Sequence, residues 1–474
     1  MKTRATKKQI ALGFVLSAIF ICGNIKNSTG AVNYYVSPAG NNANSGTTSG
    51  TAFKTISKAA SMVVAGGTVH VAAGTYAETI VTTAIGTASA RIRYVSDTKW
   101  GAIIVPVSGA YTMWSAKGGY TDIDGFQIDG TGSTSVRVGI YLNGGNSSVK
   151  NCSVHNVAEN SGCDSQGGGG LVADQGSGSA YTNYDFINNI VHHVGAGCGW
   201  IQGIYHSSTG NIKNNLIYAC SQGINMGHDD HNINVVNNTL FGNSGYGVYY
   251  GGCKEAYNNG CPTSGIRIHN NIIYDNAGGV QGPVTAEDVN NELKNNLIYG
   301  NTNNFDLASP SNNSRTGEVS ANPQFVNYIR TGGGNYHLKS NSPAIDKGIA
   351  TYAPSTDLDG IARPQGAGFD IGAYEYTLTT GIENGFTNEN SFVLYPNPFT
   401  ENFTLKISSE IILKDAVMKI YDVCGKEVKV VFINSNETTI DRGELQSGIY
   451  FYSIINNSDS YRDENVGKGK LIVQ

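Results

Sequence analysis

The sequence predicts an all-β protein whose main part is a solenoid, a coil of short strands stacked on one another. One observation is a recurring phrase, in which a Gly-Ile or Gly-Val pair is followed further along by Asn-Asn and aliphatic residues, as at Gly203-Ile204 and Asn214-Asn215. A second is its period of about 23 residues, lengthened where loops are inserted, which is typical of solenoids. A third is composition: 61 residues are Gly and only 14% are charged. This composition favours tight turns and short strands over long amphipathic helices.

The Asn-Asn pairs locate the successive turns of the coil. The second Asn of each pair falls at Asn189, Asn215, Asn238, Asn271 and Asn296, and Asn151 is interpreted as the equivalent residue one turn earlier. We expect these side chains to stack inside the coil as an amide ladder, with a structural and not a catalytic role. Because side chains alternate along a strand, the aliphatic residue after each Gly should point inward and the next residue outward.

Residues 1–31 are interpreted as a secretory signal peptide. A basic stretch, Met1–Lys8, precedes the apolar run Ile10–Cys22, and the small residues Ser28–Ala31 mark a cleavage site. No later stretch reaches the ~18 apolar residues that a membrane helix needs. We therefore expect an exported protein without a transmembrane segment.

Export places the cysteines in an oxidising compartment, where disulfides persist. Cys253 and Cys261 flank a Gly/Asn-rich insertion and are the preferred disulfide pair, while Cys163 and Cys198 also lie in predicted loops and could pair. Two further cysteines adjoin predicted strands and are expected to be buried apolar residues: Cys152 and Cys220. No Cys-x2-Cys spacing occurs, which disfavours a zinc site.

The overall charge excludes one class of partner. A net charge of −5 and a pI near 6.0 give no basic field, so nucleic acid is not an expected partner. Local patches could still bind an anionic glycan. We expect the protein to act as a monomer.

A short helix is expected to cap the open end of the coil. Apolar residues recur at helical spacing across residues 53–63, and Gly66-Gly67 ends the pattern. The phrases at Tyr34–Pro38, Phe53–Ile56 and Gly74–Tyr76 resemble the N-terminal segment of secreted right-handed parallel β-helix proteins, many of them polysaccharide lyases. The resemblance implies a right-handed parallel β-helix over residues 32–326, which would be the catalytic domain.

Residues 327–377 are interpreted as a closing segment of the β-helix. Its acidic residues and Arg363 are expected to form a structural ion-pair cluster, and Asp357 and Asp359 could alternatively hold calcium. A Thr/Gly/Asn-rich linker is expected over residues 378–390.

Residues 391–474 alternate as the strands of a small β-sandwich. The segments 392–399, 419–426, 445–450 and 470–473 closely resemble the C-terminal sorting domain of the type IX secretion system of Bacteroidetes. The resemblance implies that the type IX secretion machinery is a partner and that the protein is secreted or held at the cell surface. The resemblance concerns where the protein is exported and not its activity.

The candidate site follows the outward residues of the repeats. The residue after each Gly-aliphatic pair forms the series Tyr141, Val172, Tyr205, Asn225, Tyr249 and Gln281. A long outward-facing sheet suits a linear polymer, and tyrosines supply both a stacking surface for sugars and a phenol for proton transfer. A purely structural aromatic ladder is the alternative interpretation.

Loops beside this series add further functional groups. His228 and Asp229 follow Asn225 in a His-Asp-Asp-His run, and Lys254 and Glu255 lie in the loop after Tyr249. The run contains metal-binding atoms, but four consecutive loop residues cannot all converge on one ion, so polar-turn or substrate contacts are favoured. His206, next to Tyr205, should point inward by alternation.

The segments Gln202–His206 and Gly223–Asp229 resemble the active-site turns of β-helix lyases that act on alginate and related uronans. The resemblance implies β-elimination with Tyr205 as the phenol, Lys254 as the basic partner and His228 beside them. Substrate contacts would come from the residues Tyr141, Asn225, Tyr249, Gln281, Asp229 and Arg267. No Lys occupies the turn directly after Tyr205, where that pattern would place one.

Three alternatives stay open. A pectate lyase would use clustered acidic residues with an Arg such as Arg267. A glycoside hydrolase on the same scaffold would pair Asp229 or Asp230 with Glu255. A glycan-binding β-helix without catalysis would use the same surface. No cofactor is required by these chemistries, although calcium could take part.

Overall fold

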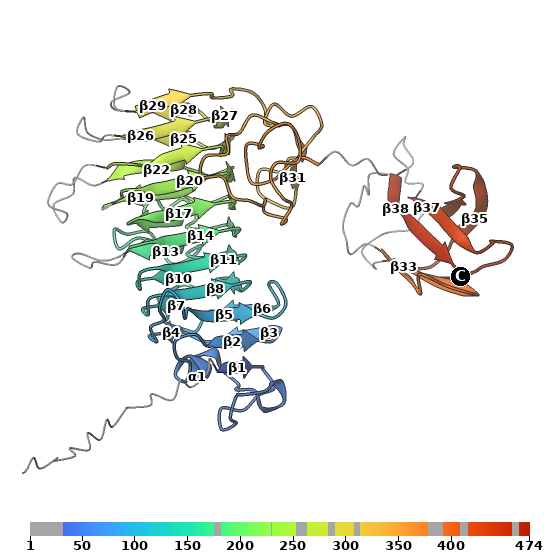
Figure 1. Ribbon diagram of the computed structural model, residues 1–474, viewed down its shortest axis with the longest axis horizontal. Helices are drawn as coiled ribbons and strands as arrows, with labels where there is room; N and C mark the ends of the chain where they lie inside the picture. Colours follow the sequence, from blue (N-terminus) through green and yellow to red (C-terminus); the bar gives the residue numbers. More distant parts are fainter. Residues whose placement is uncertain are drawn as a thin grey trace, which may run out of the picture. The chain divides into compact units, whose positions relative to one another are not determined.

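The computed structural model describes residues 32–174, 182–228, 230–252, 263–282, 290–307, 313–377, 392–407, 416–456 and 464–474 (Figure 1). The chain forms two compact units, residues 1–378 and residues 379–474. The predicted signal peptide, the linker and the Cys253–Cys261 pair lie outside the described residues.

The first unit is a coil of three long parallel sheets, named A, B and C here (Figure 1). In the described residues, sheet A has the order β1 (Asn33–Val36), β2 (Thr68–Val71), β5 (Ile92–Ser96), β8 (Thr121–Asp124), β11 (Ser147–Lys150), β14 (Tyr184–Ile187), β17 (Gly210–Lys213), β20 (Ile233–Val236), β23 (Arg267–His269), β26 (Asn291–Lys294) and β29 (Asn313–Thr316). Sheet B has the order β3 (Gly74–Ala77), β6 (Ala102–Val105), β9 (Gln127–Asp129), β12 (Ser153–His155), β15 (Ile190–His192), β18 (Leu216–Tyr218), β21 (Thr239–Phe241), β24 (Ile272–Tyr274) and β27 (Leu297–Tyr299). Sheet C has the order β4 (Ile80–Thr82), β7 (Thr112–Ala116), β10 (Val138–Leu142), β13 (Gly168–Asp174), β16 (Ile201–Ser207), β19 (Ile224–Gly227), β22 (Tyr246–Gly252), β25 (Gly278–Gln281) and β28 (Asn303–Asp306).

Neighbouring strands within each sheet are one turn of the coil apart in the chain. For example, β17, β18 and β19 belong to sheets A, B and C in turn, and β20 then returns to sheet A beside β17. All pairings inside the three sheets are parallel, for example Tyr205 beside Asn225. The predicted right-handed parallel β-helix is therefore confirmed, and one turn of this coil is called a rung below.

The second Asn of each pair forms the predicted internal ladder. The Asn189, Asn215, Asn238, Asn271 and Asn296 side chains are fully buried. Each side-chain amide of the first four donates to the Oδ1 atom of the next at 2.9 to 3.0 Å. The ladder thus satisfies polar groups inside an otherwise apolar core.

Asn151 does not belong to this ladder. The residue stacked before Asn189 is Cys152, whose backbone N–H donates to Asn189 Oδ1 at 3.0 Å. Asn151 instead accepts from the Asn188 side chain at 3.3 Å, and both residues have positive φ angles of 54° and 59°. Asn tolerates this left-handed conformation, which explains the first Asn of each pair as the turn between sheets A and B.

The Gly of the recurring phrase lies close to the core of the coil. The N–H groups of Gly203 and Ile204 donate to the consecutive carbonyls of Gln222 and Gly223, at 2.8 and 2.9 Å. A Cβ atom at position 203 would lie only 2.9 Å from Ile217 Cγ2 in the core. A side chain there would clash, so Gly is required.

The predicted cap helix is present but shorter than expected. Helix α1 spans Ile56–Ala60 after the 3-10 turn Ser49–Thr51, and it lies at the N-terminal end of the coil (Figure 1). Thr55 caps it by accepting the Lys58 N–H at 3.2 Å. Phe53 forms a bridge with Val36 and so precedes the helix. Ile56, Ala59 and Ala60 are buried against the first strands.

The closing segment packs against the outer face of sheet B. It contains the antiparallel strands β30 (Phe325–Asn327) and β31 (Asn335–Leu338). Its aromatic rings meet a column of rings on sheet B, with ring-centre distances of 4.3 Å for Tyr336 and Phe241 and 4.9 Å for Tyr328 and Tyr274. This segment therefore buries an apolar surface that the coil alone would leave exposed.

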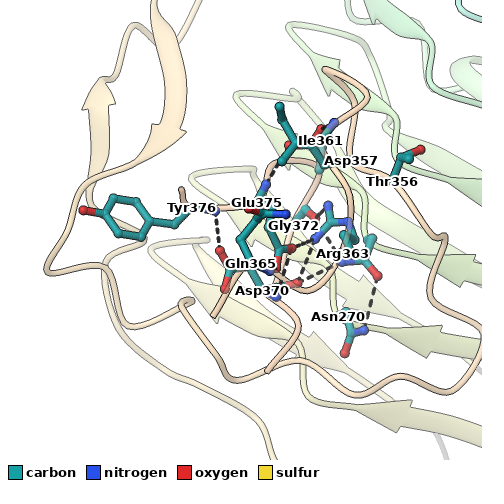
Figure 2. A network of polar contacts seen from close by, with 12 residues as sticks. Asn270, Thr356, Asp357, Ile361, Arg363, Gln365, Asp370, Gly372, Glu375 and Tyr376 are labelled. Carbon is teal, nitrogen blue, oxygen red and sulfur yellow. Dashed lines mark hydrogen bonds and ion pairs between the residues drawn. The ribbon is translucent and has the colours of Figure 1, made fainter. Parts of the chain in front are cut away.

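A buried ionic cluster holds the closing segment in place, as Figure 2 shows. Arg363 and Glu375 form an ion pair at 2.5 Å with both side chains fully buried, and Arg363 also donates to the Gly372 carbonyl at 2.9 Å. Asp370 accepts the backbone N–H groups of Asp346 and Tyr376. The expected structural ion-pair cluster is thus observed.

The carboxylates proposed for calcium are engaged by protein groups. Asp357 accepts three backbone N–H groups, those of Asp359, Ile361 and Glu375, at 2.8 to 3.0 Å. The Asp359 carboxylate lies 2.6 Å from His337 Nε2. Across the described part of the chain, no group of three or more His, Cys, Asp or Glu is arranged to hold a metal ion.

The second unit is the predicted small β-sandwich. Its antiparallel sheets are β32 (Phe392–Tyr395), β33 (Asn402–Ile407) and β36 (Glu437–Asp441), and β35 (Glu427–Ile433), β34 (Ala416–Tyr421), β37 (Gly448–Asn456) and β38 (Glu464–Val473). Phe403 and Met418, one from each sheet, share its fully buried core.

Candidate active site

The outward series of the sequence lies in register on sheet C. Tyr141 pairs with Val172, Val172 with Tyr205, Tyr205 with Asn225, Asn225 with Tyr249 and Tyr249 with Gln281. Strands β10 to β25 therefore carry one column of these side chains along the coil. The column continues one rung further to Asp306 on β28.

Tyr205 stands between two inward-pointing neighbours. Ile204 and His206 are fully buried, whereas Tyr205 is half-buried. His206 Nε2 lies 3.1 Å from the Tyr184 carbonyl oxygen, and burial lowers the pKa of His206 to about 4. The imidazole of His206 is thus a neutral core group at neutral pH, as alternation predicted, and it is not available at the surface.

The phenol of Tyr205 meets His228 and Asn225 on the next rung. The Tyr205 and His228 rings are 6.1 Å apart, edge to face at 69°. Gly227 lies beside both groups, since a Cβ atom there would be in ordinary contact with Tyr205 Oη at 3.4 Å and with Asn225 Oδ1 at 3.6 Å. A phenol, an imidazole and an amide therefore converge on one part of sheet C. Together they can transfer protons and hydrogen-bond an anionic group.

A polar cluster spans the rung of Tyr205 and the two rungs before it. Ser207 donates to Asp174 Oδ1 at 2.9 Å, and the Asn143 amide lies 3.4 Å from both Tyr141 Oη and the Asp174 carbonyl oxygen. Burial raises the pKa of Tyr141, and the Asp174 carboxylate adds to this effect. Tyr141 is thus a neutral phenol suited to hydrogen bonding.

A second carboxylate, that of Asp306, accepts hydrogen bonds at the far end of the column. Asp306 Oδ2 accepts from Tyr246 Oη at 2.8 Å and from Gln281 Nε2 at 3.0 Å. Burial and the hydrogen bond to Asp306 raise the pKa of Tyr246. Three consecutive rungs are therefore linked by polar side chains on the outer face.

The other predicted site residues lie either outside the described residues or on another sheet. Lys254, Glu255 and Asp229 lie outside the described residues. Arg267 is on β23 of sheet A, where its guanidinium lies 5.0 Å from the Tyr352 ring centre, so it does not share a face with the Tyr205 column. A role for Arg267 in substrate binding stays a prediction.

Asp230 is also unsuited to act at the surface. Its side chain is fully buried and accepts from Thr263 Oγ1 at 2.8 Å and from the Gly251 N–H at 3.2 Å. It links three segments around the C-terminal ends of the sheet C strands. These contacts assign Asp230 a structural role.

One disulfide is formed within the described residues, between Cys163 and Cys198. It joins the loops that enter β13 and β16, one rung apart. Cys152 and Cys220 are buried free thiols, as predicted, and Cys424 is exposed.

Sequence reasoning missed Ser207, Tyr246 and Asp306. A signal existed for Asp306, because it follows Gln281 by one more repeat. The other two lie two or three residues from the outward series on the same strands. Extending the outward alternation to whole strands could have found Ser207, whereas Tyr246 lies three residues before Tyr249 and falls outside that alternation.

Comparisons with known proteins identify the C-terminal unit. Residues 393–468 match the secretion system C-terminal sorting domain. This domain indicates type IX secretion and an extracellular or cell-surface location, in agreement with the sequence prediction. Residues 38–83 match the family "Protein of unknown function (DUF1565)". No described helix is long and apolar enough to cross a membrane.

Similar solved structures include several polysaccharide lyases. Pectate lyase Pel9A shares 17% identity at a TM-score of 0.49, covering 73% of this chain and 96% of that one. A rhamnogalacturonan lyase shares 15% at 0.47, covering 66% and 97%. An alginate lyase from Paenibacillus sp. str. FPU-7 shares 16% at 0.33, covering 56% and 92%. A search of curated proteins finds no match. The fold assignment rests on the three sheets of this chain itself.

Proposed function

We propose that the β-helix unit is a secreted polysaccharide lyase that cleaves an acidic, uronate-containing polysaccharide, alginate-like in character, by β-elimination. The observation that carries the proposal is the convergence of Tyr205, His228 and Asn225 on the outer face of sheet C. The long column on either side of them suits a linear polymer.

In β-elimination a base removes the proton at C5 of the uronate. The electron pair forms the C4–C5 double bond, the bond from C4 to the glycosidic oxygen breaks, and that oxygen takes up a proton. Tyr205 and His228 would together remove the C5 proton and supply a proton to the glycosidic oxygen, with Lys254 as a further basic partner. The Asn225 amide would hydrogen-bond the C5 carboxylate. No water is consumed, so a solvent-exposed sheet is compatible with the chemistry.

Described carboxylates do not support a hydrolase on this face. Two described carboxylates lie on the outer face of sheet C, those of Asp174 and Asp306. Their strands, β13 and β28, are five steps apart in the sheet. At ~4.8 Å per step they are about 24 Å apart along the coil. A glycosidase needs its two carboxyl groups within roughly 5 to 9.5 Å of each other.

The substrate test compares alginate, polygalacturonate and a glycosaminoglycan by near-ultraviolet absorbance of the unsaturated product. The proposal expects absorbing product from at least alginate. Reducing sugar released without such absorbance would contradict it and favour hydrolysis.

The residue test is Tyr205→Phe, which removes only the phenol oxygen. We expect kcat to fall by about 10²- to 10⁴-fold with little change in KM, because proton transfer is lost and binding is kept. Tyr299→Phe is the matched control, since Tyr299 is a 39% exposed tyrosine on sheet B. An unchanged kcat in Tyr205→Phe would remove this phenol from catalysis.

A further inference from the structure

Two exposed aromatic side chains lie along the margin of sheet C where its strands begin. Trp200 directly precedes β16 and is 57% exposed, and Tyr111 directly precedes β7 and is 40% exposed. Tryptophan is highly buried on average, so an indole held this far in solvent suggests a binding role.

The backbone beside Trp200 is held from several directions. Cys198 forms the disulfide to Cys163, which ties this loop to the loop of the preceding rung. The Gly199 carbonyl accepts two side-chain amides, Gln202 Nε2 at 3.2 Å and Gln222 Nε2 at 3.0 Å. The backbone next to Trp200 is thus held in place, so the indole loses little conformational entropy when it binds a ligand.

The same bracing links Trp200 to Tyr111. Tyr111 Oη donates to the Gly167 carbonyl at 2.9 Å, and a Cβ atom at Gly167 would lie 3.0 Å from the Trp200 carbonyl oxygen. The loop that ends at Gly167 is fixed in turn by the Arg137 and Asp164 ion pair at 2.5 Å. The two aromatic residues therefore flank one anchored loop.

The spacing of these residues suits a glycan that runs along the coil. Strands β7 and β16 are three steps apart in sheet C, about 14 Å at ~4.8 Å per step. Each step is close to the length of one pyranose residue in an extended chain. Tyr205 lies on β16, a few residues after Trp200, and Tyr141 lies on β10, one strand after β7, so the column runs beside the two aromatic residues.

We propose that Trp200, with Tyr111, forms a sugar-stacking subsite beside the Tyr205 centre that holds the polysaccharide by the apolar C–H faces of its pyranose rings. This rests on the proposed function for the identity of the polymer. Stacking on a ring face does not use the uronate carboxylate, so this margin should strengthen the binding of longer chains. The amides and phenols of the column would recognise the charge.

The test uses the full chain with Trp200→Ala, Trp200→Phe and the control Tyr299→Ala, an exposed aromatic on sheet B. Binding of long-chain alginate and of polygalacturonate is measured by affinity electrophoresis, and turnover by near-ultraviolet absorbance. For Trp200→Ala we expect about tenfold weaker binding and a similar rise in KM, with kcat unchanged. Trp200→Phe should keep most of the affinity, and Tyr299→Ala all of it. An unchanged thermal midpoint confirms that each variant is folded.

Tryptophan fluorescence gives a readout that does not depend on catalysis. The chain has three tryptophans, and Trp114 is fully buried. Glycan binding should shift the emission of the wild type to shorter wavelength, and Trp200→Phe should lose most of that shift although it still binds.

The outcomes separate this inference from the proposed function. Glycan binding that depends on Trp200 without any lyase product supports the subsite and overturns the lyase. Lyase activity that depends on Tyr205, with binding and KM unaltered in Trp200→Ala, overturns the subsite and keeps the lyase. Absence of binding to both polymers also overturns the subsite.

Discussion

In the amide ladder, the buried Asn side chain of a rung both accepts and donates hydrogen bonds. Asn238 Oδ1 accepts both the backbone and the side-chain N–H of Asn215 at 2.9 Å. Its own amide donates to Asn271 Oδ1 at 2.9 Å and to the Ile212 carbonyl at 2.8 Å. Every polar atom of this buried side chain is used, so the ladder adds order to the core without leaving an unsatisfied group.

Asn238→Ala should therefore be strongly destabilising. The change leaves the backbone N–H of Asn215 without its acceptor and removes one hydrogen bond each from the Asn215 side-chain amide and the Ile212 carbonyl, which should cost about 3 kcal/mol. Asn234→Ala is the matched control, since Asn234 lies on the outer face and donates to Asn211 at 3.0 Å. Thermal or urea unfolding should rank the two variants in this order. Equal midpoints would contradict the structural role of the ladder.

At the scale of strands and segments, sequence periodicity predicts local features well. The alternation of side chains was sufficient to place Tyr205 outward and His206 inward, and the structure agrees. The period also predicts the buried Asn column. It could not distinguish Asn151 from Cys152 as the member one rung earlier, because an inserted loop breaks the spacing between them and Asn189.

Contacts between distant segments could not be predicted in this way. The outer face of sheet B carries aromatic residues such as Phe241, and only the fold reveals that the closing segment covers them. Likewise, Arg267 lies on sheet A and not on sheet C, because its position within the rung decides which sheet it joins.

The buried ion pair of the closing segment permits a prediction for that element. Glu375→Gln leaves Arg363 charged in a site that is fully buried, which should cost about 3 to 5 kcal/mol. The closing segment should then loosen first, detectable as faster limited proteolysis within residues 327–377. The double variant Arg363→Met/Glu375→Leu should recover much of the loss, because it removes both charges of the pair and leaves neither one buried without the other. A double variant as unstable as the single one would contradict this account.

At the scale of the whole molecule, histidines with lowered pKa values contribute to the response to acid. Burial lowers the pKa of His206 to about 4 and that of His192 to about 3, from an ordinary value of 6.5. As the pH falls below 6.5, these residues take up protons in the unfolded chain but not in the folded protein. The unfolded state thus binds more protons, and stability falls with decreasing pH, by up to about 3 kcal/mol for each residue near pH 4.

One buried carboxyl group opposes this trend. Burial raises the pKa of Asp370 from 3.8 to about 6. The folded state therefore binds more protons than the unfolded state between these values, so this contribution is fully present below pH 3.8 and is lost as the pH rises through 6. Two histidines outweigh one aspartate, and the net effect of acidification from pH 6.5 to 4 is destabilising.

We expect the thermal midpoint of the β-helix unit to fall between pH 6.5 and pH 4, and two variants separate the contributions. His206→Gln keeps a donor for the Tyr184 carbonyl but does not titrate, so its midpoint should depend less on pH. Asp370→Asn removes the opposing group, so its midpoint should fall more steeply than that of the wild type. Calorimetry across this range measures all three proteins. Parallel curves for the wild type and His206→Gln would show that the buried imidazole does not govern the acid response.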